Sequence, residues 1–454
     1  MLGLNEKIKE LKKSGRSIKV AVVGVGQMGK GLISHLKNLS GFEVLGVADK
    51  DIEKATSALA DINFNTGQIF KLENIVRTDN LSIDDAISSS MNLGNRIKKQ
   101  VEYAVNKNKL ILTNDISILP AIEKVDVVID ATGYPDVGAF IALSALGRKK
   151  HVITLNVESD ITIGPILKET AKNYGKVYTL SAGDEPAALK ELYDFADGIG
   201  LEVVAAGKGK NNPLDFEANP TSIAEYAAKK GSSAKMMTSF VDGTKSMIEM
   251  ACLSNATGLI SDCRGMHGPK ANIKDLIRTF SLKKDGGILG KKGVVDFVIG
   301  DLAPGVFLVY SSENKMIKEV LKYLQFGEGP NYLLYRPYHL TSVETPLSIA
   351  RVYFYSEPTI VPTGGLISEV ITIAKKDLRE GETIDGIGGY TVYGLIDLYN
   401  VAKKENLLPI GLSQNCIVKR NLKKGQPISF DDIEFPYDSL IMKLRRLQDE
   451  TIQK

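Results

Sequence analysis

The sequence predicts an α/β protein that begins with a Rossmann-type dinucleotide-binding domain, continues with an α+β catalytic domain and ends with a small β-rich domain. Three observations predict this order. A glycine-rich turn follows the first strand, an acidic residue follows the second strand, and the composition changes to glycine-rich turns with charged and amide residues after residue 156. At 454 residues the chain exceeds the usual size of one core, so several domains are expected.

The first element is a β-branched run over residues 18–23, which predicts a buried strand. It leads into a turn that contains Gly24, Gly26 and Gly29, and apolar residues then recur at helical spacing over residues 28–39. Gly24 permits a tight strand-to-helix turn, Gly26 lets a pyrophosphate approach the backbone, and Gly29 permits close helix packing. This stretch therefore predicts a dinucleotide site.

A second apolar run, over residues 42–48, predicts the second strand and delivers Asp49 to the position of a ribose-binding carboxylate. Asp49 repels a 2′-phosphate and the adjacent Lys50 attracts one, so these residues leave NAD and NADP both open. The expected cofactor contacts lie on this turn and at the ends of later strands: Gly24, Gly26, Gln27, Met28, Gly29, Asp49, Lys50, Ala131, Thr132, Gly133 and Asn156.

The rest of the first domain, expected to cover residues 1–156, departs from the simplest pattern. No strong strand follows the second one closely, so residues 50–124 are expected to form an elaborated connection with a helix near 86–105 and a short strand over 110–112. Strands over 125–130 and 151–156 then flank a helix near 136–146, and the first of these strands ends where a nicotinamide ribose commonly passes.

The catalytic domain, expected over residues 157–347, contains two neighbouring acids, Asp184 and Glu185, between a strand and a helix. One interpretation is that they cap the helix, because acids are favoured at a helix N-terminus. The other is that they supply acid-base chemistry or hold a divalent cation such as Mg²⁺ or Mn²⁺, together with Glu158 and also Asp160.

A second candidate site is the segment over residues 207–213, which is expected to be a turn after a strand. Lys208, Lys210, Asn211 and Asn212 could neutralise and hydrogen-bond a phosphate or a polyol on a substrate. A solvated basic turn is the alternative interpretation.

Two further ionisable residues are candidates for catalysis. Lys245 precedes a helical run, and a partly desolvated lysine can act as a general acid. His267 stands between glycine-rich positions, where a catalytic role and a structural hydrogen bond are both open.

The third domain is expected over residues 348–454. It contains two similar turns, Leu378–Gly381 and Leu422–Gly425, each with the pattern Leu-x-x-Gly after an extended segment. These turns predict a small β-rich domain, and an amphipathic run over residues 440–447 predicts a packed C-terminal helix.

The composition argues against several classes of protein. Lysine and arginine number 57 against 54 acids, without a long basic block, so no nucleic-acid partner is expected. The N-terminal segment lacks the apolar core of a signal peptide, and no run approaches the ~18 apolar residues of a membrane span. The three cysteines lack C-x-x-C spacing. We therefore expect a cytoplasmic protein with a small-molecule substrate. We also expect a homo-oligomer, a dimer.

Together these motifs resemble the homoserine-dehydrogenase-like oxidoreductases that bear a C-terminal SAF domain. The resemblance spans nearly the whole chain, from the glycine turn through Asp130–Gly133, 156–160, 182–186, 207–213, 239–245 and 265–269. It implies NADP as cofactor. Two departures argue against homoserine as substrate: Val157 replaces the lysine of the family's Thr-Ala-Asn-Lys segment, and Asp184 and Glu185 replace small or apolar residues.

The group includes an alternative 1-deoxy-D-xylulose 5-phosphate reductoisomerase of isoprenoid (methylerythritol phosphate) biosynthesis. The resemblance therefore implies a hydride transfer to a small, phosphorylated carbonyl substrate. Homoserine dehydrogenase is the alternative activity on the same scaffold. A non-catalytic protein that senses the cofactor is an alternative from a different class.

Overall fold

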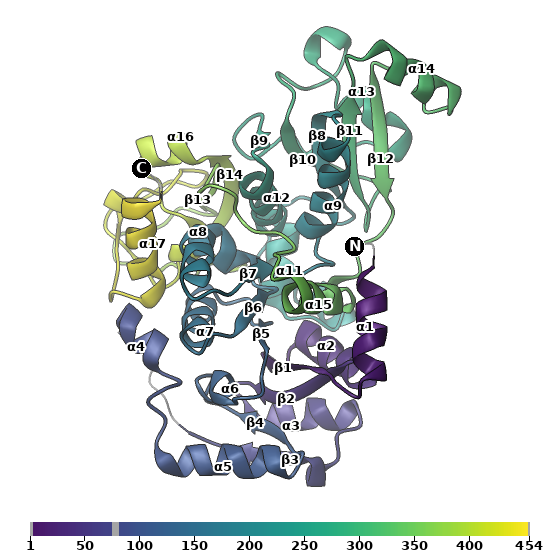
Figure 1. Ribbon diagram of the computed structural model, residues 1–454. Helices are drawn as coiled ribbons and strands as arrows, with labels where there is room; N and C mark the ends of the chain where they lie inside the picture. Colours follow the sequence, from purple (N-terminus) through teal and green to yellow (C-terminus); the bar gives the residue numbers. More distant parts are fainter. Residues whose placement is uncertain (1–2, 75–80, 453–454) are drawn as a thin grey trace. The chain divides into compact units, whose positions relative to one another are not determined.

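The structure, a computed structural model, describes residues 3–74 and 81–452. The chain forms two compact units that alternate along the sequence (Figure 1). Unit 1 comprises Met1–Asp184, Leu340–Val361 and Tyr437–Lys454, and unit 2 comprises Glu185–His339 and Pro362–Pro436. The expected domain boundaries after residues 156 and 347 coincide with no boundary between these units. Residues 75–80, within the expected elaborated connection, lie outside the described residues.

Unit 1 contains a seven-stranded sheet with the order β3-β4-β2-β1-β5-β6-β7, in which every pairing is parallel. The strand order reverses beside β1, because β2 lies on one side of it and β5 on the other. Ligands of doubly wound sheets bind at the carboxyl ends of strands at such a point. This topology confirms the predicted Rossmann-type α/β fold. The strands are β1 (Ile18–Val23), β2 (Phe42–Ala48), β3 (Ile69–Leu72), β4 (Leu110–Thr113), β5 (Val127–Asp130), β6 (His151–Thr154) and β7 (Tyr178–Leu180).

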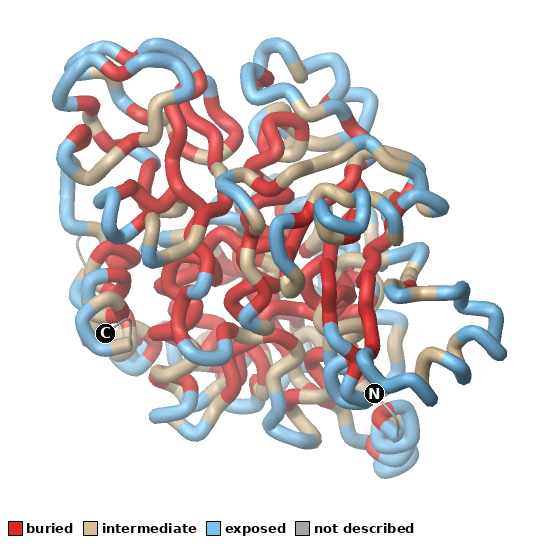
Figure 2. The backbone as a smooth tube through the Cα atoms, turned by 90° about the horizontal axis from the view of Figure 1, so that it is seen from above, coloured by how far each residue is buried: buried red, intermediate tan, exposed pale blue. Residues whose placement is uncertain are grey.

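The helices of unit 1 cover a sheet whose central strands are buried. Every residue of β4, β5 and β6 is buried, as a parallel sheet covered on both faces requires, and Figure 2 shows such buried segments in red. The helices are α1 (Leu4–Lys13), α2 (Gln27–Asn38), α3 (Ile52–Asp61), α4 (Ile83–Ser88), α5 (Asn95–Asn106), α6 (Ile118–Ala121), α7 (Pro135–Gly147), α8 (Val157–Asn173), α15 (Thr345–Tyr355) and α17 (Leu440–Thr451), with the 3₁₀ helices η1 (Thr66–Gln68) and η4 (Thr341–Val343).

The helix expected near residues 86–105 is in fact two helices, α4 and α5. The reason is local: three consecutive serines end the first helix, and Gly94, in extended backbone, precedes the second. Serine and glycine favour turns and caps over helix interiors. The short strand expected over 110–112 is present as β4.

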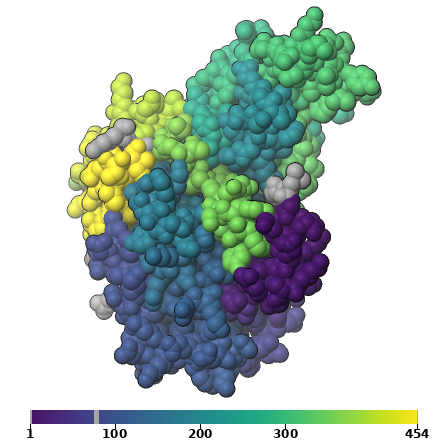
Figure 3. Space-filling model, in the orientation of Figure 1, coloured from purple at the N-terminus to yellow at the C-terminus, as the bar shows by residue number. Residues whose placement is uncertain are grey.

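Two helices from late in the sequence complete unit 1. Helix α15 packs beside α1, as Figure 3 shows where the green segment meets the purple N-terminal helix. Helix α17, predicted over 440–447, packs on α7 and α8. This arrangement explains why the unit is not continuous in sequence.

Helix α17 also supplies hydrogen bonds to backbone groups of α8 that lack their usual partners within the helix. Pro165 lies inside α8, where proline disturbs the backbone hydrogen bonds of a helix. The fully buried amide of Gln448 accepts a hydrogen bond from the Ile166 N–H at 3.1 Å and donates one to the Thr162 carbonyl at 3.2 Å. One side chain thus satisfies the donor and the acceptor that would otherwise bond to each other within the helix.

Unit 2 contains a mixed five-stranded sheet with the order β12-β11-β8-β10-β9. Strand β8 lies at its centre, parallel to β10 and antiparallel to β11, and helices α9 and α12 pack on the sheet. The strands are β8 (Glu202–Lys210), β9 (Ile260–Ser261), β10 (Val294–Ile299), β11 (Val306–Ser311) and β12 (Asn331–Arg336). The helices are α9 (Glu185–Gly198), α10 (Ala224–Lys229), α11 (Ala234–Val241), α12 (Thr244–Thr257), α13 (Leu276–Thr279), α14 (Lys315–Tyr323), η2 (Ile273–Asp275) and η3 (Lys283–Asp285).

The remainder of unit 2 is a β-rich segment, as the repeated turns predict. The two turns pair with each other: the Leu378 and Leu422 amides each donate to the carbonyl of the other residue at 2.9 Å. Gly381 and Gly425 close the turns with φ of 81° and 80°, which glycine readily adopts. The elements are β13 (Ser368–Ala374), β14 (Val392–Leu398), α16 (Tyr399–Lys404), η5 (Ile410–Leu412), β15 (Ile417–Val418), η6 (Phe430–Asp432) and β16 (Ile433–Glu434).

Across the described part of the chain, the helices are all too short or too polar to cross a bilayer.

Candidate active site

The turn between β1 and α2 has the geometry that a bound pyrophosphate needs. Gly24 has a φ of 95°, and a Cβ atom at Gly29 would lie 1.9 Å from the Gly24 carbonyl oxygen, so both positions require glycine. A Cβ atom at Gly26 would meet only open space. Helix α2 begins there without a capping side chain from the described residues. Its first N–H groups can therefore hold an anion at the positive end of the helix dipole.

Asp49, at the end of β2, holds this turn in place. Its Oδ2 accepts a hydrogen bond from the Val25 N–H at 2.8 Å, and its Oδ1 accepts one from the Asp51 N–H at 3.1 Å. Lys50 is exposed, and its Nζ lies 5.6 Å from the centre of the Tyr134 ring. Asp49 is thus tied to the predicted pyrophosphate turn, and a ribose contact stays a prediction.

Asp130 organises the turn that follows β5. One carboxylate oxygen accepts hydrogen bonds from the Thr132 amide at 2.9 Å and its hydroxyl at 2.7 Å, and the other accepts from Asn156 Nδ2 at 3.0 Å. Burial raises the pKa of Asp130, against the hydrogen bonds that lower it. Asn156 is fully buried, donates also to the Tyr134 carbonyl at 2.9 Å and accepts from the Ser159 amide at 3.1 Å. The Asn156 side chain therefore shapes this turn from within.

In unit 2, three charged side chains meet in the interior. Lys208, on the central strand β8, donates to Glu185 Oε1 at 2.5 Å and to Glu249 Oε2. Glu185 begins α9 and Glu249 lies within α12, and both helices pack on the sheet that contains β8. Lys208 is 4% exposed and Glu249 is 1% exposed. Two carboxylates therefore surround one ammonium away from bulk water, and we call these three residues the Lys208 cluster.

The charges of the Lys208 cluster do not cancel. Burial disfavours the Lys208 ammonium, but the neighbouring Glu185 and Glu249 outweigh burial and raise its pKa, so the lysine stays charged. Burial, followed by repulsion from Glu185, raises the pKa of Glu249, while Lys208 and Lys245 lower it. Lys245, a predicted catalytic residue, lies one helical turn before Glu249 on α12. The excess carboxylate gives the cluster an affinity for a further proton or cation.

His339 borders the Lys208 cluster. Its Nδ1 lies 2.7 Å from the Pro304 carbonyl oxygen, which only accepts, so the proton of the neutral ring is on Nδ1. Its Nε2 lies 3.6 Å from Glu185 Oε1, and the side chain is 14% exposed. In the neutral ring, Nε2 is therefore a hydrogen-bond acceptor beside the cluster.

The expectation that Lys208 and Lys210 lie in a turn was wrong, because β8 continues through both residues. The glycines beside them do not form a turn; they allow close packing of the β8 backbone against its neighbours. A Cβ atom at Gly207 would lie 2.4 Å from the Asp296 carbonyl oxygen of the neighbouring strand. Glycine within a strand often marks such a close approach of two backbones.

Lys210 has a different environment from Lys208. Its Nζ donates to Asn212 Oδ1 at 2.5 Å and to the Phe240 carbonyl. Burial, followed by repulsion from Lys208, lowers the pKa of Lys210 to about 8. Asn212 is buried and Asn211 is exposed. Lys210 can therefore exchange a proton near neutral pH, and the substrate contacts predicted for this segment stay predictions.

His267 belongs to another group of side chains in unit 2. Its Nε2 lies 2.9 Å from Asp262 Oδ2, its Nδ1 lies 3.9 Å from Cys263 Sγ, and its backbone N–H donates to Asp296 at 3.1 Å. Burial raises the pKa of Asp296 to about 6, against hydrogen bonds that lower it. The hydrogen-bonding groups that the structure records around His267 include no member of the Lys208 cluster.

The acids predicted as a metal site are divided between the units. Asp184 and Glu158 belong to unit 1, and Glu185 begins unit 2. Glu158 was expected at the end of a strand, but it lies in the first turn of α8 and is 7% exposed. The helix starts earlier than predicted because Asn156 caps it, with its side chain accepting from the Ser159 amide.

Sequence reasoning proposed no role for Glu249 or His339. A signal for Glu249 exists in the sequence, since it is the single charged residue within the apolar run Met247–Leu253. A lone charge in a buried helix requires a partner of opposite charge. No comparable signal exists for His339, whose contacts come from distant parts of the chain.

A comparison with protein families adds to this description. Residues 183–345 match the family model described as "Oxidoreductase DRL, catalytic domain". The matched segment contains all three residues of the Lys208 cluster and His339. This match identifies the chain as an oxidoreductase. Among curated proteins, none matches the chain.

Solved structures show only distant similarity. An NAD-binding oxidoreductase from Klebsiella pneumoniae is 14% identical with a TM-score of 0.28; the match covers 45% of this chain and 47% of that one, about half its length. A DOX-P reductoisomerase in complex with magnesium is 16% identical with a TM-score of 0.38. That match covers 75% of this chain and 70% of the reductoisomerase chain. Myo-inositol dehydrogenase from Lactobacillus casei, in complex with NAD(H) and myo-inositol, is 17% identical with a TM-score of 0.37. That match covers 76% of this chain and 89% of the dehydrogenase chain.

Proposed function

We propose that this chain is an NAD(P)H-dependent reductase of a small, phosphorylated carbonyl compound, with 1-deoxy-D-xylulose 5-phosphate reductoisomerase as the specific activity. The observation that carries the proposal is the buried Lys208 cluster within the segment that matches an oxidoreductase catalytic domain. The cofactor would bind at the turn from Gly24 to Gly29, whose free N–H groups suit a pyrophosphate.

The reaction would need a hydride, a proton and a cation. NAD(P)H delivers the hydride to the carbonyl carbon, the carbonyl oxygen becomes negatively charged, and a proton converts it to the alcohol. An ammonium held in a buried site stabilises such a developing oxyanion more strongly than it would in water. In our proposal Lys208 supplies this charge: its carboxylate partners keep it protonated, and a proton on Glu249, whose pKa is raised, removes the excess negative charge of the cluster.

The proton would come from Lys210 or His339. The pKa of Lys210 is lowered to about 8, which is close to the working pH that favours general acid catalysis. His339 would donate from Nε2, beside Glu185, in its doubly protonated form. An isomerisation before the hydride transfer would pass through an enediolate-like species, which the same positive charge would stabilise.

A divalent cation could also bind at this cluster. The oxygens that Glu185 and Glu249 offer lie within 4.8 Å of each other, and hard oxygen ligands suit Mg²⁺. A cation bound there would polarise the substrate oxygen. Lys208 Nζ bonds both carboxylates, so a metal ion and this ammonium would compete for the same oxygens. A titration of activity with a chelator separates the two cases, because the lysine-based site does not respond to it.

The SAF-like character of residues 348–454 is part of the same proposal. The pairing of the two Leu-x-x-Gly turns through Leu378 and Leu422 supports a compact β-rich segment. The predicted dimeric state and cytoplasmic location also remain proposals.

The decisive experiment measures NADPH consumption with 1-deoxy-D-xylulose 5-phosphate, aspartate semialdehyde and short ketoses. We expect turnover with the phosphorylated substrate. Turnover with aspartate semialdehyde instead would favour homoserine dehydrogenase. Cofactor binding without turnover of any carbonyl would refute the reductase and leave a cofactor-sensing protein.

A further inference from the structure

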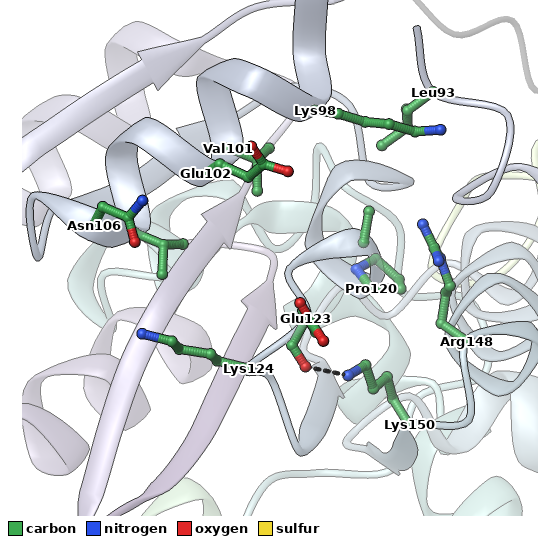
Figure 4. A pocket seen from close by; sticks show the side chains of 12 residues that line it. Leu93, Lys98, Val101, Glu102, Asn106, Pro120, Glu123, Lys124, Arg148 and Lys150 are labelled. Carbon is green, nitrogen blue, oxygen red and sulfur yellow. Dashed lines mark hydrogen bonds between the residues drawn. The ribbon is translucent and has the colours of Figure 1, made fainter. Parts of the chain in front are cut away.

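Unit 1 contains a pocket of about 510 Å³ that the proposed reaction does not use (Figure 4). It is lined by residues of α5 with Leu93 before it, by the end of α6 with the segment that leads from it into β5, and by the segment between α7 and β6. Both segments precede parallel strands, so they lie at the amino ends of these strands. The turn from Gly24 to Gly29 follows the carboxyl end of β1, at the opposite edge of the sheet. The pocket is therefore separate from the predicted cofactor site.

The lining of the pocket carries an excess of positive charge. Its charged side chains are four cations and two carboxylates: Lys98, Lys124, Arg148, Lys150, Glu102 and Glu123. Most of the rest is apolar, including Leu93, Val101 and Pro120. This composition suits a ligand that combines a doubly charged anion with a less polar part, and the volume lies in the range of small-molecule sites.

Arg148 provides a donor that the protein itself does not use. Its Nη2 donates to the Ser90 carbonyl at 2.9 Å, which fixes the guanidinium at the pocket. Its Nε is buried and has no hydrogen-bond partner among the described residues. Because the Nε atom is enclosed, a ligand in the pocket would meet the guanidinium through its terminal nitrogens, which suit the oxygens of an anion.

Lys150 lies beside Arg148 in the same pocket. Its Nζ donates to the Glu123 carbonyl at 2.7 Å, drawn as a dashed line in Figure 4. Burial lowers the pKa of Lys150, as do Lys176 and Arg148, while Asp126 and Glu123 raise it. An anion between Arg148 and Lys150 would relieve the repulsion between these two cations.

We propose that this pocket binds a phosphomonoester, with the phosphate held by Arg148 and Lys150 and with Lys98 and Lys124 at the rim. The excess of two positive charges matches a phosphate group, which carries about −1.5 to −2 near pH 7. The guanidinium fork and the ammonium supply the charge-assisted donors that phosphate oxygens accept. The apolar residues contact the remainder of the ligand.

Isothermal titration calorimetry of the full chain tests the proposal, with glycerol 3-phosphate, inorganic phosphate and glycerol as probes. The titrations are made with NADP⁺ at saturating concentration, so that the glycine turn is occupied. We expect saturable binding of glycerol 3-phosphate, weaker binding of inorganic phosphate and no binding of glycerol. Tighter binding of inorganic phosphate would overturn the phosphomonoester as the ligand.

Two lysines on α5 provide a matched pair of variants. Lys98 and Lys99 are both exposed, but only Lys98 lines the pocket. We expect Lys98→Gln to weaken glycerol 3-phosphate binding several-fold and Lys99→Gln to leave it unchanged. Arg148→Gln should weaken it about tenfold or more, the usual effect of losing a charge-assisted hydrogen bond. The melting temperature of each variant checks that it is folded.

Three results would overturn the proposal. The first is an absence of binding by the parent chain. The second is an equal effect of Lys98→Gln and Lys99→Gln, which would indicate only diffuse surface charge. The third is binding that is lost in Lys208→Gln but unchanged in folded Arg148→Gln, which would place the phosphate at the Lys208 cluster instead.

Discussion

Replacement of Gly26 by valine should abolish dinucleotide binding without unfolding the protein. Gly26 has φ of −68° and ψ of −171°, an extended conformation that any residue adopts. A Cβ atom there would meet no other atom within 4 Å. We therefore expect the free energy of unfolding to change by no more than about 0.5 kcal/mol, as for other surface substitutions without lost contacts.

The effect on the cofactor should be much larger, because the valine side chain would fill the space that the pyrophosphate needs. Each charge-assisted hydrogen bond to an anion contributes about 1.5–3 kcal/mol. The loss of two such bonds from the first N–H groups of α2 gives about 3–6 kcal/mol. This corresponds to a rise of more than about 100-fold in the dissociation constant of NADPH.

Gly29→Ala is the informative control for this experiment. A Cβ atom at Gly29 would lie 1.9 Å from the Gly24 carbonyl oxygen, so even alanine must displace the backbone. We expect Gly29→Ala to lower the melting temperature and Gly26→Val to leave it unchanged. Fluorescence titration with NADPH measures the affinity. A folded Gly26→Val protein with parental NADPH affinity would refute the assignment of the cofactor to this turn.

Three further predictions concern other parts of the chain. Lys208→Gln removes the ammonium that is proposed to stabilise the oxyanion, so turnover should fall by at least about 100-fold. Glu202→Gln, on the same strand, is the control, and equal turnover in both variants would refute the site. Turnover should fall as the pH rises above about 8 if Lys210 donates the proton, and Lys210→Gln should lack this decline in a pH-rate profile. Because the unfolded state then binds more protons than the folded state, the free energy of unfolding should rise between pH 8 and 10.5 in the parent protein only. Gln448→Leu removes the amide that bonds to α8 and should cost about 1–3 kcal/mol of stability in denaturant unfolding, and an unchanged midpoint would show that water replaces the amide.

The first β-α-β unit could be predicted because its determinants are local. Glycine at positions 24, 26 and 29 and the β-branched strand before them fix the turn within a dozen residues. The environment of Lys208 could not be predicted in the same way. Its partners Glu185 and Glu249 lie 23 and 41 residues away, so only the packing of two helices on β8 brings them together. The glycines beside Lys208 led to the wrong prediction of a turn over residues 207–213, because glycine occurs both in turns and where two strands pack closely.

The assembly of unit 1 from three separate segments of the chain could not be predicted from local sequence patterns, for a similar reason. The amphipathic run at residues 440–447 predicts a helix, and α17 confirms it, but the pattern does not specify which surface the helix covers. The paired turns at Leu378 and Leu422 could be identified as a repeat, yet their mutual hydrogen bonds follow only from the three-dimensional structure.

The dependence of α8 on Gln448 has a consequence for the order in which the chain folds as it is made. During synthesis, the whole of unit 2 emerges from the ribosome before α17 does. Until that moment the backbone beside Pro165 lacks the amide that completes it, and the faces of α7 and α8 that α17 covers remain bare. We therefore expect unit 1 to expose apolar surface until α17 has been made, whereas unit 2 can close earlier. A ribosome stalled before residue 440 should hold the first unit in a protease-sensitive state.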